Sequence, residues 1–156
     1  MNDDQQPQTG AASAPQYSGP AKKILLVEDD GALANTYMMR LQAEDFNVKR
    51  VNNGEDAMAT AIAFKPDLII LDVMMPKVSG FEVLDILRNT PETANLKIMV
   101  LTALGQDGDK QRAADLGADD YLVKSQVVIA DVIARIRFHL GMDGDHPADS
   151  PGPQVV

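Results

Sequence analysis

The chain contains no cysteine, so a disulfide framework, a thiolate zinc site and a cysteine nucleophile are all excluded. Basic residues are also scarce, with 14 against 23 acidic residues and a formal net charge of −9. Because charge of that sign repels phosphate backbones and anionic lipid surfaces, we expect neither nucleic acid nor a membrane as a partner.

Long apolar runs are missing too. No stretch approaches the ~20 apolar residues of a membrane-spanning helix, and the N-terminal residues lack the apolar core of a signal peptide, so we expect a cytoplasmic protein. Residues 1–20 and 141–156 have few large aliphatic side chains and are rich in Pro, Gly and small or polar residues. Such segments bury too little surface to offset the entropy of ordering, which predicts disordered tails around one domain at 21–140.

Short apolar runs alternate with segments of helical periodicity inside this domain. The runs lie at 24–27, 46–51, 68–71, 98–101 and 121–123. The first, third and fourth are unbroken, as expected for parallel strands covered on both faces, whereas the other two are more mixed or shorter, which is typical of edge strands. The pattern predicts an α/β fold of the (βα)5 type: a doubly wound, flavodoxin-like parallel five-stranded sheet with strand order 2-1-3-4-5. The fourth helix, roughly 107–116, offers few apolar contacts and should be the least firmly docked.

Polar side chains stand where the predicted strands end. Glu28, Asp29 and Asp30 follow the first strand, Asp72 follows the third, Thr102 ends the fourth and Lys124 follows the fifth. In an open doubly wound sheet these strand ends meet at the edge where ligands bind. Carboxylates crowded there would repel one another unless a cation lay among them, and a few carboxylate oxygens with room for water favour Mg2+.

These residue types suit phosphoryl transfer, in which a site must neutralise and position three equatorial oxygens. Asp72 would be the nucleophile that forms an acyl phosphate. Glu28 and Asp29 would hold the metal ion. Lys124 would pair with one phosphoryl oxygen, and Thr102 would donate a hydrogen bond to another.

Four segments resemble the response-regulator receiver family, whose minimal example is the chemotaxis protein CheY, over roughly 21–140. They are ILLVEDD (24–30), LDVMMPKVSG (71–80), MVLTA (99–103) and ADDYLVK (118–124). The resemblance implies a CheY-like fold with the phosphorylation site at Asp72 and catalytic roles for Thr102 and Lys124. It implies Mg2+ ligands from Asp29, Asp72, the Met74 backbone carbonyl and, through water, Glu28. It also implies a switch pair, in which the Thr102 hydroxyl moves toward the phosphoryl group and the Tyr121 ring turns inward.

The same resemblance implies a bacterial two-component signalling switch rather than an enzyme, one that catalyses only its own phosphorylation and dephosphorylation. A histidine kinase or histidine phosphotransfer protein would donate the phosphoryl group. The output surface would be the face formed by the fourth helix, the fifth strand and the fifth helix. Because no DNA-binding or catalytic domain follows Leu140, we expect a stand-alone receiver that regulates a downstream protein target or forms a homodimer on phosphorylation.

The sequence departs from the family pattern in two places. Most receivers have proline after the lysine, usually with a cis peptide, but this chain has Ser125. A cis bond without proline costs about 2.5 to 4 kcal/mol, so the loop is expected to be trans or strained. Met74 and Leu104, each two residues beyond a site residue, are apolar where many receivers have polar groups. They could shield the acyl phosphate from water, which predicts a long-lived phosphorylated state.

Three other functions fit the residues less well. A phosphoryl carrier or sink would use turnover at Asp72 without changing the output face. A structural interaction domain would keep the fold without the chemistry, for which Ser125 is the sole support. A phosphatase of the haloacid dehalogenase type would need a second aspartate two residues after the nucleophile, where this chain has Met74.

Several polar residues also have simpler interpretations. Asp30 is better explained as a charge at a helix N-terminus than as a metal ligand, and Tyr121 as a switch competes with half-buried packing on an edge strand. Arg135, Arg137 and His139 are expected to form a solvated face of the last helix.

Overall fold

The structure, a computed structural model, describes residues 19–142, so the tail predictions for 1–18 and 143–156 lie outside the described residues. The elements are β1 (Lys23–Val27), α1 (Gly31–Ala43), β2 (Asn47–Val51), α2 (Gly54–Phe64), β3 (Leu68–Leu71), α3 (Gly80–Asn89), β4 (Lys97–Thr102), α4 (Asp107–Asp115), β5 (Asp120–Val123), the 3-10 turn η1 (Lys124–Gln126) and α5 (Ile129–His139). All five predicted strands are present, each with ends within one residue of its predicted bounds. Within residues 19–142, no helix is long and apolar enough to cross a membrane.

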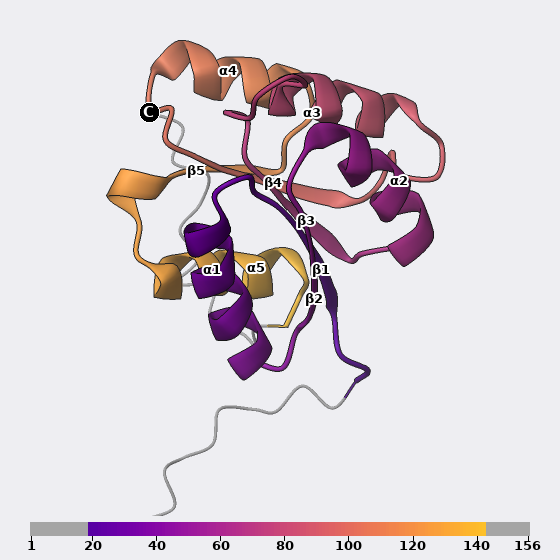
Figure 1. The fold of residues 1–156 in the computed structure, drawn as a ribbon, viewed down its shortest axis with the longest axis vertical. Helices are drawn as coiled ribbons and strands as arrows, with labels where there is room; N and C mark the ends of the chain where they lie inside the picture. Colours follow the sequence, from indigo (N-terminus) through magenta and orange to yellow (C-terminus); the bar gives the residue numbers. More distant parts are fainter. Residues whose placement is uncertain (1–18, 143–156) are drawn as a thin grey trace, which may run out of the picture.

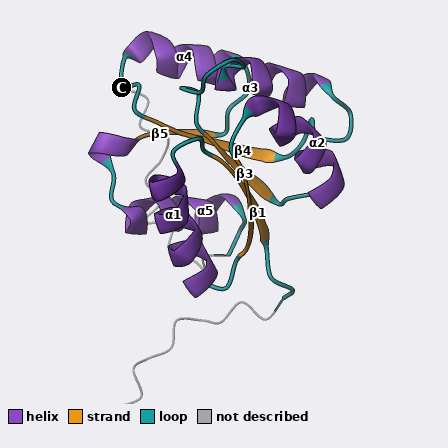
Figure 2. Ribbon diagram, viewed as in Figure 1, coloured by secondary structure: helices purple, strands orange, loops and turns teal. Residues whose placement is uncertain are grey.

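The strands form one parallel sheet in the order β2-β1-β3-β4-β5. Helices α1 and α5 cover one face, and α2, α3 and α4 cover the other (Figure 1). Figure 2 shows the same sandwich, with the strands between two helical layers. The predicted doubly wound fold and strand order are confirmed. Because the strand order reverses between β1 and β3, the carboxyl ends of these strands open a crevice where a ligand can bind.

Alternation along the central strands builds two hydrophobic cores. Leu25 and Ile69 point into the core beneath α2 and α3, whereas Ile24 and Leu26 point into the core beneath α1 and α5. All four side chains are at most 1% exposed. Burial of such side chains stabilises a fold by about 1.5 to 3 kcal/mol each. The site at the strand ends therefore stands on strands whose side chains are fully buried on both faces of the sheet.

The turn from β3 into α3 explains part of the LDVMMPKVSG segment. Ser79 caps α3, and its hydroxyl accepts a hydrogen bond from the amide of Phe81. At Gly80 a Cβ atom would overlap the backbone of Asp72 and Val73. Only glycine therefore allows the start of α3 to pack directly against the segment that carries Asp72.

Helix α4 is the most weakly anchored helix, as predicted. It buries one residue, Ala113, whereas each of the other helices buries at least three. Its N-cap, Gln106, makes no side-chain capping bond. The Arg112 guanidinium lies 4.2 Å from the centroid of the Phe81 ring, which adds a cation–π contact to α3. Few buried contacts allow this helix to shift at low cost.

The interpretation of Arg135, Arg137 and His139 as a solvated face is wrong. Arg135 Nε lies 3.2 Å and His139 Nε2 lies 2.8 Å from Asp120 Oδ2, with all three side chains largely buried. Arg137 Nη2 lies 2.7 Å from Glu44 Oε2. Burial alone would raise the pKa of Asp120, but the contact with His139 and the charge of Arg135 outweigh it and lower the pKa. These pairs fasten α5 to β5 and to the end of α1.

We expect Asp120→Asn to lower the free energy of unfolding by roughly 3 kcal/mol near neutral pH, because it removes the largely buried carboxylate that Arg135 and His139 both contact. The pKa of Asp120 is lower in the folded than in the unfolded protein, so its contribution is complete above the unfolded value and is lost as pH falls through the folded value. The difference between variant and wild type should therefore shrink below pH 3.8, the ordinary aspartate pKa. Urea denaturation followed by circular dichroism over a pH series measures this. Asp115→Asn, the same change at an exposed position of α4, is the matched control, and a difference that does not vary with pH would contradict the assignment.

Candidate functional site

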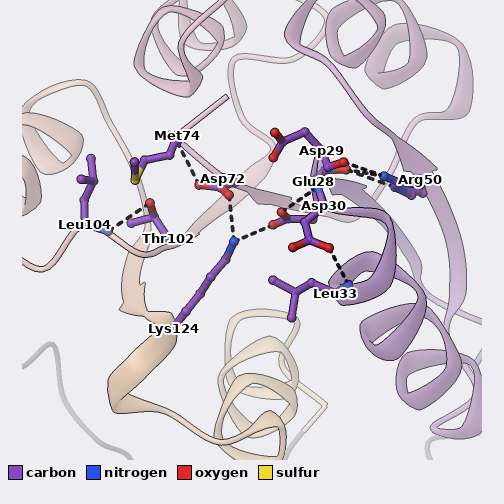
Figure 3. A network of polar contacts seen from close by, with 10 residues as sticks. All are labelled: Glu28, Asp29, Asp30, Leu33, Arg50, Asp72, Met74, Thr102, Leu104 and Lys124. Carbon is purple, nitrogen blue, oxygen red and sulfur yellow. Dashed lines mark hydrogen bonds and ion pairs between the residues drawn. The ribbon is translucent and has the colours of Figure 1, made fainter. Parts of the chain in front are cut away.

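Acidic side chains from β1 and β3 meet at the carboxyl edge of the sheet. Glu28 and Asp29 follow β1, Asp72 follows β3, and one carboxylate oxygen of each lies within 4.8 Å of the others. Glu28 and Asp72 are almost fully buried, whereas Asp29 is exposed. Figure 3 shows these side chains gathered at one rim together with Lys124 and Thr102. The structure thus brings the predicted site residues together.

Lys124 bridges the two buried carboxylates. Its Nζ donates to Asp72 Oδ2 at 2.8 Å and to Glu28 Oε2 at 2.9 Å (Figure 3). Burial alone would lower the pKa of Lys124, but the bonds to both carboxylates outweigh it and raise the pKa. No cis peptide occurs within residues 19–142, so the Lys124–Ser125 bond is trans. Serine in place of proline therefore leaves the ammonium inside the site.

Backbone amides hold the remaining carboxylate oxygens. The Asp30 amide donates to Glu28 Oε1 at 3.2 Å, and the Met74 amide donates to Asp72 Oδ1 at 2.9 Å. Burial and then the nearby charge of Asp72 raise the pKa of Glu28, while the hydrogen bond from Lys124 acts in the opposite direction. Asp30 itself caps α1, accepting from the Leu33 amide at 3.0 Å, as its interpretation as a helix N-terminal residue predicted.

The three carboxylates fit a hard divalent cation. Glu28, Asp29 and Asp72 offer oxygen ligands only, which Mg2+ prefers. Among the described residues nothing donates a hydrogen bond to the Asp29 carboxylate, so it can turn toward an ion without breaking a contact. The Met74 amide is fixed on Asp72, which places the Met74 backbone beside the same cluster; a ligand role for its carbonyl stays a prediction.

Thr102 and Tyr121 contact the backbone of the same residue, Leu104. Thr102 is fully buried, and its hydroxyl accepts from the Leu104 amide at 3.4 Å. The Tyr121 hydroxyl donates to the Leu104 carbonyl at 2.7 Å. Burial, with the charges of Asp109 and Asp72 adding to it, raises the pKa of Tyr121 to about 12. The two side chains are therefore linked through the loop between β4 and α4.

Two residues near the site escaped the sequence analysis. Arg50 on β2 donates to the backbone carbonyls of Glu28 and Asp29. Tyr37 on α1 is buried, and its pKa is raised by burial and by Glu28, while Lys124 lowers it. An arginine on an edge strand and a tyrosine on an amphipathic helix carry no local pattern that marks them as neighbours of the site.

Comparison with known proteins identifies the family. Residues 24–137 match the family model described as the response regulator receiver domain. The DNA-binding dual master transcriptional regulator RpaA of Synechocystis is 40% identical over 115 residues, which cover 74% of this chain and 47% of RpaA. The phosphate regulon transcriptional regulatory protein PhoB of Rhizobium meliloti is 44% identical over 102 residues, covering 65% of this chain and 45% of PhoB.

Solved structures of response regulators are similar to this chain as well. The BeF3-activated receiver domain of Klebsiella pneumoniae RstA superposes with a TM-score of 0.71 at 32% identity, covering 76% of this chain and 98% of that one. A putative response regulator from Chloroflexus aurantiacus gives a TM-score of 0.73 at 30% identity, with coverages of 78% and 98%.

The chain spans about half the length of the curated relatives it matches. Stand-alone action and the absence of nucleic-acid binding therefore stay predictions, because RpaA is named as a DNA-binding protein. Receiver domains of two-component systems are signalling switches rather than classical enzymes, and they bind Mg2+ through acidic residues such as those gathered here. The family match over most of the sequence, the CheY-like strand order and the acidic rim lead to one conclusion: this chain belongs to the response-regulator receiver family.

Proposed function

We propose that residues 21–140 form a receiver that accepts a phosphoryl group on Asp72 in an Mg2+-dependent reaction in the cytoplasm. The donor would be a histidine kinase or a histidine phosphotransfer protein. The observation that carries the proposal is the Lys124 ammonium, which contacts Asp72 and Glu28 at hydrogen-bonding distance beside the exposed Asp29 carboxylate. A nucleophile, a cation and metal ligands at one rim are what phosphoryl transfer requires.

The chemistry assigns a task to each group. Asp72 Oδ2 would attack the phosphorus of a phosphohistidine while the N–P bond breaks, and the imidazole nitrogen keeps the electron pair and takes up a proton. Mg2+, bound by Asp29, Asp72, the Met74 carbonyl and, through water, Glu28, would neutralise charge on the phosphoryl oxygens. Because Lys124 already contacts Asp72 Oδ2, a short movement lets it pair with a phosphoryl oxygen instead.

The output would follow from Thr102 and Tyr121. A Thr102 hydroxyl that turns to donate to a phosphoryl oxygen gives up its contact with the Leu104 amide, and Tyr121 is bonded to the same residue. Tyr121 lines a groove of about 290 Å³ over β5, together with residues of α4 and α5 that include Lys110, Asp131 and Arg135. The α4–β5–α5 face would change with it, and a downstream protein or a second copy of the chain would read that change.

Asp72→Asn should abolish phosphorylation by acetyl phosphate and Mg2+, because an amide cannot form the acyl phosphate. Intact-mass spectrometry and phosphate-affinity electrophoresis measure the labelling. Asp85→Asn, the same change at an exposed position on α3, should be labelled like the wild type. Labelling of the Asp72 variant, or none of the wild type, would contradict the proposal.

The same reaction followed by NMR separates a switch from a phosphoryl sink. A switch should show shift changes at Leu104, Tyr121 and α4 on phosphorylation. Changes confined to the residues around Asp72, with rapid loss of the label, would indicate a sink whose output face does not respond.

The lifetime of the acyl phosphate should depend on Met74 and Leu104. Met74 is 51% exposed and Leu104 is half-buried, and Figure 3 shows both beside Asp72 and Thr102. Replacing both with asparagine should speed hydrolysis severalfold, because polar side chains can hold the attacking water that the apolar ones exclude. Loss of label after donor removal measures the rate. Met39→Asn, at a 72% exposed position on α1, is the control, and an unchanged rate in the double variant would refute the shielding role.

Lys124→Met should destabilise the metal-free protein by roughly 1 to 3 kcal/mol, because the carboxylates of Glu28 and Asp72 lose the cation between them. Mg2+ should then stabilise the variant more than it stabilises the wild type, since the ion no longer competes with an ammonium. Thermal unfolding with and without saturating Mg2+ tests both points, with Lys97→Met at the exposed start of β4 as the control. Equal Mg2+ stabilisation of variant and wild type would argue against a metal ion at these carboxylates.

A further inference from the structure

Arg50 donates hydrogen bonds to the backbone of Glu28 and Asp29, the acidic residues that follow β1, from outside the site. It lies on the edge strand β2, where it pairs with Leu26 of β1. This is one residue before β2 ends. Its Nε and Nη2 both donate to the Glu28 carbonyl, at 3.1 and 2.9 Å, and Nη2 also lies 3.3 Å from the Asp29 carbonyl. A forked guanidinium can hold two successive carbonyls in this way, whereas a lysine ammonium cannot match the planar fork.

The loop needs this contact because β1 has already ended. The Glu28 amide still bonds to the Val51 carbonyl at 3.2 Å, but the two carbonyls that follow lie beyond the last strand pairing. Among the described residues, Arg50 is the only group whose side chain donates to them. The Glu28 carboxylate is separately fixed by Lys124 and by the Asp30 amide. Within residues 19–142 nothing anchors the Asp29 carboxylate in the same way, so its position depends on the backbone that Arg50 holds.

Charge and orientation act in opposite directions here. A cation near a cation site disfavours Mg2+ through repulsion, whereas a fixed loop favours Mg2+ because the ligand is already in place. The guanidinium faces carbonyl oxygens, and Figure 3 shows it on the far side of the loop from Asp72 and Lys124. The dipoles of the Glu28 and Asp29 carbonyls also offset part of the positive potential of the guanidinium. We therefore expect orientation to outweigh repulsion.

We propose that Arg50 is a positioning residue for the magnesium site, which holds the Glu28–Asp29 backbone so that the Asp29 carboxylate is preorganised for the ion. The inference rests on the proposed Mg2+-dependent function and extends it to a residue on the edge strand. Arg50 touches neither the ion nor the phosphoryl group in this assignment. Its effect should therefore appear in the affinity for Mg2+ and not in the rate of the loaded site.

The test is a titration of the full chain with MgCl2, followed by amide shifts in 15N NMR spectra. Arg50→Met should raise the Mg2+ dissociation constant by roughly tenfold, the lower end for groups that orient metal ligands. Arg50→Lys keeps the charge but loses the forked guanidinium. Its Mg2+ dissociation constant should lie between those of Arg50→Met and the wild type. Lys49→Met removes a cation from the neighbouring position of β2, where Nζ lies over the Phe64 ring at 5.9 Å. It should bind Mg2+ within about twofold of the wild type.

The rate of labelling by acetyl phosphate at saturating Mg2+ completes the experiment, because a positioning role predicts that excess ion restores the wild-type rate in both Arg50 variants. The dispersion of the same spectra shows that each variant is folded, and Arg50→Lys serves if Arg50→Met is not. Mg2+ binding as tight as or tighter than wild type in the folded variants would overturn the inference, as would a labelling defect that excess Mg2+ does not repair. If the wild type itself bound no Mg2+, the proposed function would fail first.

Discussion

The crowding of negative charge at the carboxyl edge of the sheet is the constraint on which the rest of the site depends. Three carboxylates whose oxygens lie within 4.8 Å of one another repel strongly unless positive charge is placed among them. In this structure Lys124 supplies it, from a position 96 residues along the chain from Glu28. The two carboxylates that bind the ammonium are also the two that a metal ion and a phosphoryl group would share. The resting state and the proposed phosphorylated state would therefore balance the same negative charge in two different ways.

That balance is possible because the fold separates rigid from adjustable parts. The carboxylates follow β1 and β3, whose side chains are packed from both faces by two hydrophobic cores. The lysine follows the edge strand β5, and the loop after β4 leads into α4, the helix with the fewest buried residues. A ligand can therefore move Lys124 and the β4–α4 loop without disturbing the strands that hold the nucleophile.

The sequence predicted the sheet, its strand order and which side chains gather at its carboxyl edge, because these features depend on patterns that are visible in the sequence itself. Unbroken apolar runs mark buried parallel strands, and a polar residue directly after such a run must lie at one edge. Arg50 and the Asp120–Arg135–His139 cluster were missed because the partner of a long polar side chain depends on packing between distant elements. Arg135 and His139 were misread for the same reason: a polar residue on a helix appears solvated until a buried carboxylate on β5 is placed beneath it.

The shared contact at Leu104 shows how a local change at the strand ends can reach a distant surface. One amide and one carbonyl of this residue satisfy Thr102 and Tyr121, so neither side chain can reorient without leaving a backbone group of Leu104 to find another partner. The cheapest response is movement of the loop that carries Leu104, because that loop leads directly into the weakly docked α4. Fastened to α1 and β5 through its own ion pairs, α5 resists the same displacement. A signal at Asp72 would thus change the relation of α4 to α5 by moving α4 alone.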